Sequence, residues 1–170
     1  MDRLILLLAR GGGLGLAPKA PGTVGTLGGF PLTALLLWPG NFWIYLTGCV
    51  VLVPISAWVC GEAERILDRE DPGEVVIDEI IAVPMCYLGV FALMTFHGDG
   101  MPTLQDVWEL PQVWIWAVAG FGLFRLFDIW KPGPIDRAQS FHKGWGVTMD
   151  DVLAGLLTGA ILGGVYFGSH

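Results

Sequence analysis

Residues 42–60 read FWIYLTGCVVLVPISAWVC, a run that contains no charged side chain. A helix needs about 20 mainly apolar residues to cross the hydrocarbon core of a bilayer, and this stretch meets that requirement. The composition of the whole chain agrees, because 54% of its 170 residues are hydrophobic and only 15% are charged, against about 25% charged in an average soluble domain. The sequence therefore predicts a membrane protein organised around spanning helices.

Other apolar stretches extend this prediction. A shorter one, residues 27–38, contains Pro31 and is expected to be a short span or a re-entrant segment. Residues 4–9 are expected to form a helical stretch near the membrane surface. We predict an all-α polytopic membrane bundle of four or five spans, the first short or re-entrant, that forms one domain over residues 1–170. Besides 42–60, the long stretches are 80–96, 113–127 and 152–167.

The basic residues are distributed unevenly between the two sides that these spans define. The opposite side, with the loop at 97–112, has acidic residues but no lysine or arginine. Since positively charged loops stay in the cytoplasm, the basic side is expected to be cytoplasmic. The net charge of -7 argues against nucleic acid as a partner. The residues on or next to the basic side are Arg3, Arg10, Lys19, Arg65, Arg69, Arg125, Lys131, Arg137 and Lys143.

A first polar cluster, residues 17–26, reads APKAPGTVGT and precedes an apolar helix. Glycines allow a backbone to approach an anion closely, and free N–H groups at a helix start favour phosphate. Lys19, Thr23 and Thr26 are therefore candidate phosphate-binding residues. The alternative is that Thr23 or Thr26 only caps the helix that follows.

Asp78 and Glu79 form a second cluster, two adjacent acids at the start of the 80–96 stretch. Acids beside a membrane span are costly and are therefore usually functional. Neighbouring side chains on a helix point about 100° apart, so we expect them to serve two ligands rather than to chelate one metal ion from one face. The alternative is a favourable interaction of negative charge with the helix N-terminus.

A third cluster, residues 125–132, reads RLFDIWKP. Arg125 and Asp128 are three residues apart and share a helix face, and Lys131 lies near the helix end. Two cations beside a carboxylate suit a phosphate next to a metal ion. The alternative is an intrahelical ion pair that lowers the cost of burying Arg125 and Asp128.

A fourth cluster, residues 144–151, reads GWGVTMDD and opens the last span. Asp150 and Asp151 follow a glycine-rich turn, and paired carboxylates of this kind suit Mg²⁺, which is bound through oxygen ligands together with substrate phosphate. The alternative is structural, because Thr148 and Asp151 also have the spacing of a capping box.

The predicted topology brings all four clusters to one membrane surface. Acids and cations together fit a metal-assisted reaction on a phosphate. His142 lies on the same side and is expected to be a solvated loop residue. The alternatives are a transporter for a cation or phosphate, and a lipid head-group-binding protein without turnover. The converging residues are the acids Asp78, Glu79, Asp128, Asp150 and Asp151 and the cations Lys19, Arg125 and Lys131.

In order and spacing, the four motifs resemble those of the phosphatidylglycerophosphatase A family, over about 140 residues. The resemblance implies a Mg²⁺-dependent phosphatase of the bacterial cytoplasmic membrane, with its active site facing the cytoplasm. Its lipid substrate would be phosphatidylglycerophosphate, hydrolysed to phosphatidylglycerol and phosphate. The five acids are then the expected metal-binding and catalytic residues. Phosphate binding is expected from Lys19, Thr23, Thr26, Arg125 and Lys131; no oligomeric state is indicated.

Overall fold

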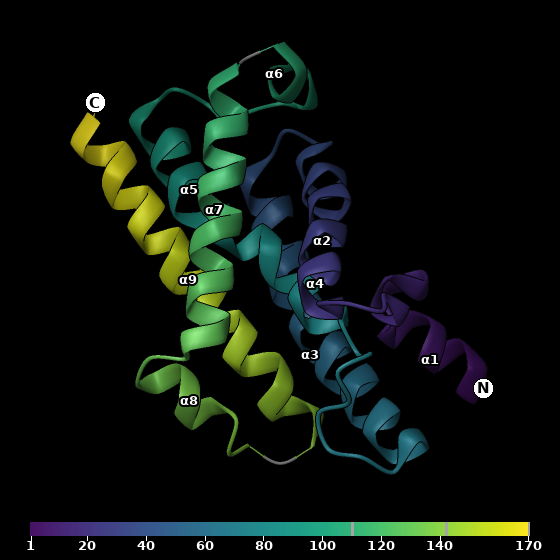
Figure 1. The fold of residues 1–170 in the computed structure, drawn as a ribbon. Coiled ribbons are helices and arrows are strands. Elements are labelled where there is room, and N and C mark those ends of the chain that lie inside the picture. Colours follow the sequence, from purple (N-terminus) through teal and green to yellow (C-terminus); the bar gives the residue numbers. More distant parts are fainter. Residues whose placement is uncertain (110, 142, 170) are drawn as a thin grey trace.

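The computed structural model describes residues 1–109, 111–141 and 143–169, and every regular element in these ranges is helical (Figure 1). This confirms the predicted all-α class. In chain order the elements are α1 (Asp2–Ala9), the 3-10 helix η1 (Gly11–Leu16), α2 (Pro21–Leu37), α3 (Phe42–Leu67), α4 (Ile77–Ala82), the 3-10 helix η2 (Val83–Tyr87), α5 (Leu88–His97), α6 (Leu104–Glu109), α7 (Pro111–Trp130), α8 (Pro134–Ala138) and α9 (Gly144–Ser169).

Four of the described helical segments are long and apolar enough to cross a membrane: α3, the α4–η2–α5 segment, α7 and α9. The fifth predicted stretch is the shorter helix α2, which has 17 residues and contains Pro31. It starts at Pro21 instead of near residue 27, because proline is well suited to the first helical position. Residues 21–26 of the 17–26 cluster therefore form the first turns of α2, and residues 17–20 precede the helix.

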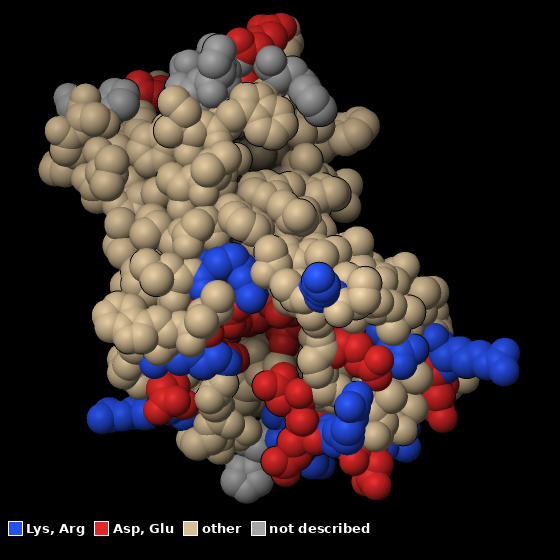
Figure 2. Space-filling view, viewed as in Figure 1, with Lys and Arg blue, Asp and Glu red and all other residues tan. Residues whose placement is uncertain are grey.

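The connections fall at two opposite ends of the bundle (Figure 1). The turn between α2 and α3 lies at the same end as α6, and the loop between α3 and α4 lies at the other end with α8. In the face drawn in Figure 2, every basic side chain lies toward the α8 end, whereas the α6 end shows only acidic charge. On this face the positive charge is therefore one-sided, as the sequence indicates.

Helix α9 packs against α3, α5, α7, α8 and α4 with η2. Small residues bring its backbone unusually close to its neighbours. A Cβ atom on Gly144 would lie 2.2 Å from the backbone nitrogen of Gly61 in α3, and one on Gly89 of α5 would lie 2.2 Å from the carbonyl oxygen of Gly159. Such contacts are a common way to pack helices in lipid.

The third span is interrupted in its middle by η2, which contains Pro84. Proline supplies no N–H to the helix, and an unpaired backbone group is costly inside a membrane protein. The buried Tyr45 of α3 satisfies another backbone group at this break, because its hydroxyl donates a hydrogen bond to the Pro84 carbonyl at 2.8 Å. The interruption leaves α4 as a separate short helix, and its first turn carries Asp78 and Glu79.

We predict that Gly144→Ala destabilises the protein. Its methyl group would lie 2.2 Å from the Gly61 nitrogen and 2.3 Å from the Ala57 carbonyl oxygen, both of which are backbone atoms of α3. Overpacking of this kind typically costs about 1–3 kcal/mol, so the melting temperature in detergent should fall.

Gly164→Ala provides the matched control on the same helix, because a Cβ at Gly164 meets no atom within 4 Å. This variant should melt at or above the wild-type temperature, since alanine favours a helix over glycine by about 1 kcal/mol. If Gly144→Ala melted like wild type, the close approach of α3 and α9 would be wrong.

Candidate active site

The first turn of α4 places two acids inside the bundle. The residue before α4, Val76, is fully buried, and its N–H donates to the carbonyl of Ala9 at 2.9 Å, which ties the helix start to α1. Asp78 is 3% exposed, and its Oδ1 accepts a hydrogen bond from the backbone N–H of Glu79 at 3.1 Å. The Glu79 side chain is 14% exposed. Both acids are therefore largely withdrawn from water.

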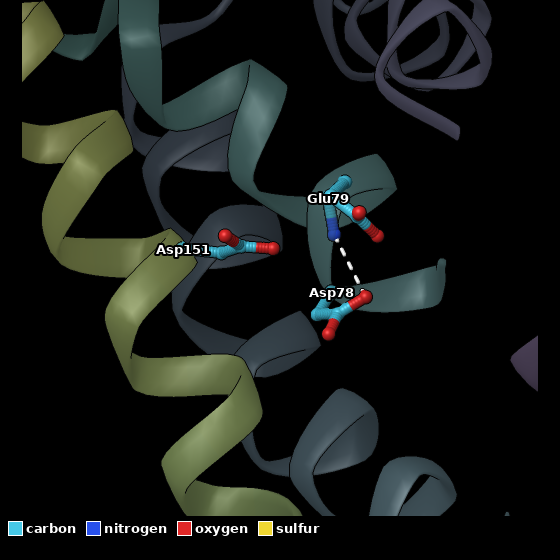
Figure 3. A group of neighbouring side chains, drawn as sticks. All are labelled: Asp78, Glu79 and Asp151. Carbon is cyan, nitrogen blue, oxygen red and sulfur yellow. Dashed lines mark hydrogen bonds between the residues drawn. The ribbon is translucent and has the colours of Figure 1, made fainter. Parts of the chain in front are cut away.

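A third acid reaches the same point from α9. Asp151 is 4% exposed, and its carboxylate lies beside those of Asp78 and Glu79 (Figure 3). One oxygen of each carboxylate lies within 4.8 Å of the others. Asp78 and Glu79 thus each place an oxygen within reach of a single ion, which the directions of neighbouring side chains on a helix did not lead us to expect. The third oxygen comes from another helix, α9, so the group forms across a helix interface and not on one helix face.

Arg125 joins this group from α7. Its Nη1 donates to Asp128 one turn along the helix and lies 4.0 Å from Oε1 of Glu79. The predicted intrahelical ion pair is thus present, and it also holds the guanidinium beside the carboxylate group. Arg125 Nε and Glu79 Oε2 are buried without a hydrogen-bond partner within the described ranges. Both groups therefore have unused capacity to bind a ligand.

Asp150 has a cation of its own. Lys131 follows α7 with a φ of 48°, and its Nζ donates to Asp150 Oδ2 at 2.5 Å. Gln139 donates to the same oxygen at 3.0 Å. Burial lowers the pKa of Lys131, but the hydrogen bond and the negative charge of Asp150 outweigh it, so this pKa lies above its ordinary value. Asp150 is therefore held as half of an ion pair next to the other acids.

The start of α2 forms another wall of the site. A Cβ on Gly22 would lie 2.3 Å from Glu79 Oε1 and 3.3 Å from Arg125 Nη1, so a larger residue would have to displace these side-chain ends. Thr26 is fully buried, and its hydroxyl donates to the Gly22 carbonyl at 2.8 Å. Thr23 is partly exposed in the first turn, and Lys19 is exposed just before the helix.

Two alternative structural roles are wrong. Neither Thr23 nor Thr26 caps α2, because the helix begins at Pro21 and its N-cap residue, Ala20, makes no side-chain cap. Thr148 and Asp151 do not form a capping box, because both lie inside α9, which already begins at Gly144. The Thr148 hydroxyl instead contacts Ser56 of α3. Capping therefore does not explain why a threonine and an acid occur at these positions.

The charges of the site do not balance locally. Arg125 pairs with Asp128, and Lys131 pairs with Asp150. Within residues 1–109, 111–141 and 143–169, no ion pair is found for Asp78 or Asp151. Glu79 has only the distant contact with Arg125 Nη1, at 4.0 Å. Neighbouring carboxylates disfavour one another's ionisation. Two buried carboxylates and a largely buried third within reach of one ion fit a hard divalent cation, which prefers oxygen ligands.

Two residues of this site were not predicted as functional. Gly22 belongs to the 17–26 motif, and its position between a proline and a threonine is typical of a helix start. Its contact with Glu79, however, depends on how the helices pack. Gln139 has no distinctive sequence pattern around it and reaches Asp150 only because α8 folds back under α9. His142 lies outside the described residues.

The face of the molecule in Figure 2 shows how this site meets its surroundings. Acidic side chains are set back in the middle of the face, between basic side chains on either side. The fold and the site thus define a class, the polytopic helical membrane proteins with carboxylates, an arginine and a lysine gathered at one end of the bundle.

Comparison with known proteins identifies the family within this class. The family model described as "Phosphatidylglycerophosphatase A" matches residues 7–166. Two curated proteins named phosphatidylglycerophosphatase A are 34% identical to the chain: one from Escherichia coli K12, over 96% of this chain and 83% of the relative, and one from Haemophilus influenzae, over 89% and 82%. The chain belongs to the phosphatidylglycerophosphatase A family and is a phosphatase.

A third relative carries a different name. A Bacteroides thetaiotaomicron protein, provisionally named a phosphatidylinositol-3-phosphatase, is also 34% identical, over 90% of this chain and 87% of its own length. No solved structure matches the chain with comparable significance. The relatives' names share the removal of a phosphate from a lipid head group and differ in the head group.

The carboxylate group generates a prediction about stability. Asp78→Asn removes one of three mutually repelling charges and keeps the oxygen that accepts the Glu79 N–H, so it should raise the melting temperature in EDTA. A divalent cation at a concentration 100 times its Kd should stabilise the wild type by about 2.7 kcal/mol. It should stabilise the variant much less. Scanning fluorimetry in detergent measures both effects.

Asp106→Asn serves as the control, because Asp106 lies at the other end of the bundle and bonds only to its neighbour Thr103 in the described structure. It should respond to EDTA and cation as the wild type does. A lower melting temperature for Asp78→Asn in EDTA would contradict the repulsion between the three carboxylates.

Proposed function

We propose that this protein hydrolyses the terminal phosphomonoester of phosphatidylglycerophosphate and requires Mg²⁺ to do so. We place it in the bacterial cytoplasmic membrane with the site facing the cytoplasm, as the side of the basic residues indicates. The observation that carries the proposal is the group of three buried carboxylates, from Asp78, Glu79 and Asp151, beside the guanidinium of Arg125. The names of the relatives support the substrate.

Asp78, Glu79 and Asp151 would hold the Mg²⁺, because each offers a carboxylate oxygen and Glu79 Oε2 is buried without a partner in the described structure. A bound Mg²⁺ supplies Lewis-acid polarisation of the phosphoryl group and activation of a water. Asp128 and Asp150 belong to the same site in this proposal. They orient Arg125 and Lys131 through the two ion pairs, and they complete the set of five acids expected from the sequence.

The cations would bind the phosphate. Arg125 lies beside Glu79, and the Nε of Arg125 has no hydrogen-bond partner within the described ranges. A guanidinium can bind two phosphate oxygens at once. The start of α2 adds free backbone N–H groups and the favourable end of a helix dipole. Thr23 in this turn and the exposed Lys19 just before it can contact the outer oxygens, while buried Thr26 fixes the turn itself.

The reaction also needs a proton to move. A bond forms between the water oxygen and phosphorus, the bond from phosphorus to the glycerol oxygen breaks, and that oxygen must gain a proton. Carboxylates are suited to accept the proton of the water and to return one to the leaving oxygen. The buried acids of the site are the groups of this chain that can do both.

The structure of the bundle also bears on the two alternative functions. Between the carboxylates and the α6 end, large buried side chains such as Tyr45, Phe91 and Phe124 fill the interior. This favours a one-sided site over a transport path. A head-group-binding protein would need the cations but has no evident need for three buried carboxylates. Phosphatidylinositol 3-phosphate is an alternative substrate. It is suggested by the name of the Bacteroides thetaiotaomicron relative.

Phosphate release by the purified protein tests the proposal. We expect release from phosphatidylglycerophosphate in detergent with Mg²⁺, none with EDTA, and slower release from phosphatidylinositol 3-phosphate. A preference for the inositol lipid would reassign the substrate, and release that persists in EDTA would remove Mg²⁺ from the reaction. A folded protein that releases no phosphate from either lipid would contradict the proposed activity.

Asp151→Asn should lower kcat by about a hundredfold or more, which is the usual loss when one stabilising electrostatic group is removed from an active site. Asp106→Asn, at the opposite end, should keep wild-type activity. The comparison uses protein that elutes as a single species in detergent. Wild-type turnover by Asp151→Asn would exclude this carboxylate from the site.

A further inference from the structure

A separate polar cluster lies between α3 and α9, next to the carboxylate group. Ser56 and Thr148 are both fully buried, and their hydroxyl oxygens are 3.1 Å apart. The thiol of Cys60, one turn further along α3, is 3.8 Å from each hydroxyl. Buried hydroxyl groups need partners, and these two supply one to each other across the helix interface.

The hydrogen bond occurs where the two helices are in closest contact. Gly144 of α9 lies against Gly61 and Ala57 of α3. Thr148 is one turn beyond Gly144 on the same face of α9. The glycine contact sets the distance between the helices, but it does not prevent rotation or sliding. A directional hydrogen bond one turn away restricts both movements.

Rotation of α9 at this point moves the carboxylate site. Asp151 is three residues after Thr148 and therefore projects from nearly the same side of the helix. It meets Asp78 and Glu79 within 4.8 Å. Mg²⁺ demands near-ideal geometry at about 2.0–2.1 Å from its ligands, so a small displacement of Asp151 is enough to weaken binding.

We propose that Ser56 and Thr148 are positioning residues: their hydrogen bond sets the orientation of α9 that directs the Asp151 carboxylate toward Asp78 and Glu79, and so raises the affinity of the site for a divalent cation. The inference rests on the proposed function, because it takes these carboxylates to be cation ligands. It assigns a role to two buried hydroxyl groups that do not themselves belong to the carboxylate site.

Direct binding of Mn²⁺ to the purified full-length protein in detergent, followed by electron paramagnetic resonance, tests this without turnover. Thr148→Val keeps the shape of the side chain and removes the hydroxyl, and should weaken Mn²⁺ binding by about ten- to a hundredfold, as loss of a group that orients a metal ligand usually does. Ser56→Ala should show a similar loss. Thr148→Ser retains the hydroxyl and should recover most of the affinity.

Thr158→Val is the matched control. Thr158 is fully buried in the same helix, but its hydroxyl donates to the carbonyl of Ala154 within α9 at 2.9 Å. The variant removes a buried hydroxyl without touching the contact with α3, so it should bind Mn²⁺ like the wild type. An equal loss in Thr158→Val would show a general packing effect and overturn the positioning role.

The remaining outcomes separate this inference from the proposed function. Wild-type affinity in both Thr148→Val and Ser56→Ala, with Mn²⁺ bound in each, would overturn the positioning role and leave the cation site in place. A wild-type protein that binds no Mn²⁺ would overturn the cation site and this inference together. Ser56→Ala also keeps the test decisive if Thr148→Val fails to fold.

Discussion

Charge repulsion between buried carboxylates is the constraint around which this bundle is organised. Taking a charge out of water is costly unless a partner compensates it, and five acids meet at one end of the helices. Two of them receive a cation from the chain itself, Arg125 for Asp128 and Lys131 for Asp150. The other three share one space. The Mg²⁺ proposed above would compensate these three carboxylates, and the same ion would serve the chemistry of a phosphatase.

Close backbone packing makes this convergence possible. The acids come from α4, α7 and α9, and the start of α2 covers them. Large residues at Gly22 or Gly144 would push α2 away from Glu79 or separate α9 from α3. Both glycines lie at the start of their helices, at the second residue of α2 and the first of α9. The break at Pro84 also contributes, because it leaves α4 as a short separate helix.

The site also combines two environments that its chemistry requires. Asp78 and Asp151, proposed to bind the cation, are buried among helices, while Lys19 is exposed and the Lys131 side chain is 26% exposed. A lipid head group at the membrane boundary can reach such a site without leaving the bilayer. This arrangement explains why an apolar, acidic chain concentrates all its lysine and arginine at one end.

The sequence by itself determined the helical membrane class, the approximate spans, the side on which the charges gather and the family, because hydropathy and motif order are properties of the linear chain. The tertiary structure decided how the acids are grouped. Asp150 pairs with Lys131 while Asp151 joins Asp78 and Glu79, and Gln139 and Gly22 become part of the site. Adjacent residues on a helix point in different directions, so which neighbour each one meets depends on how the helices pack and rotate, and no local pattern encodes that.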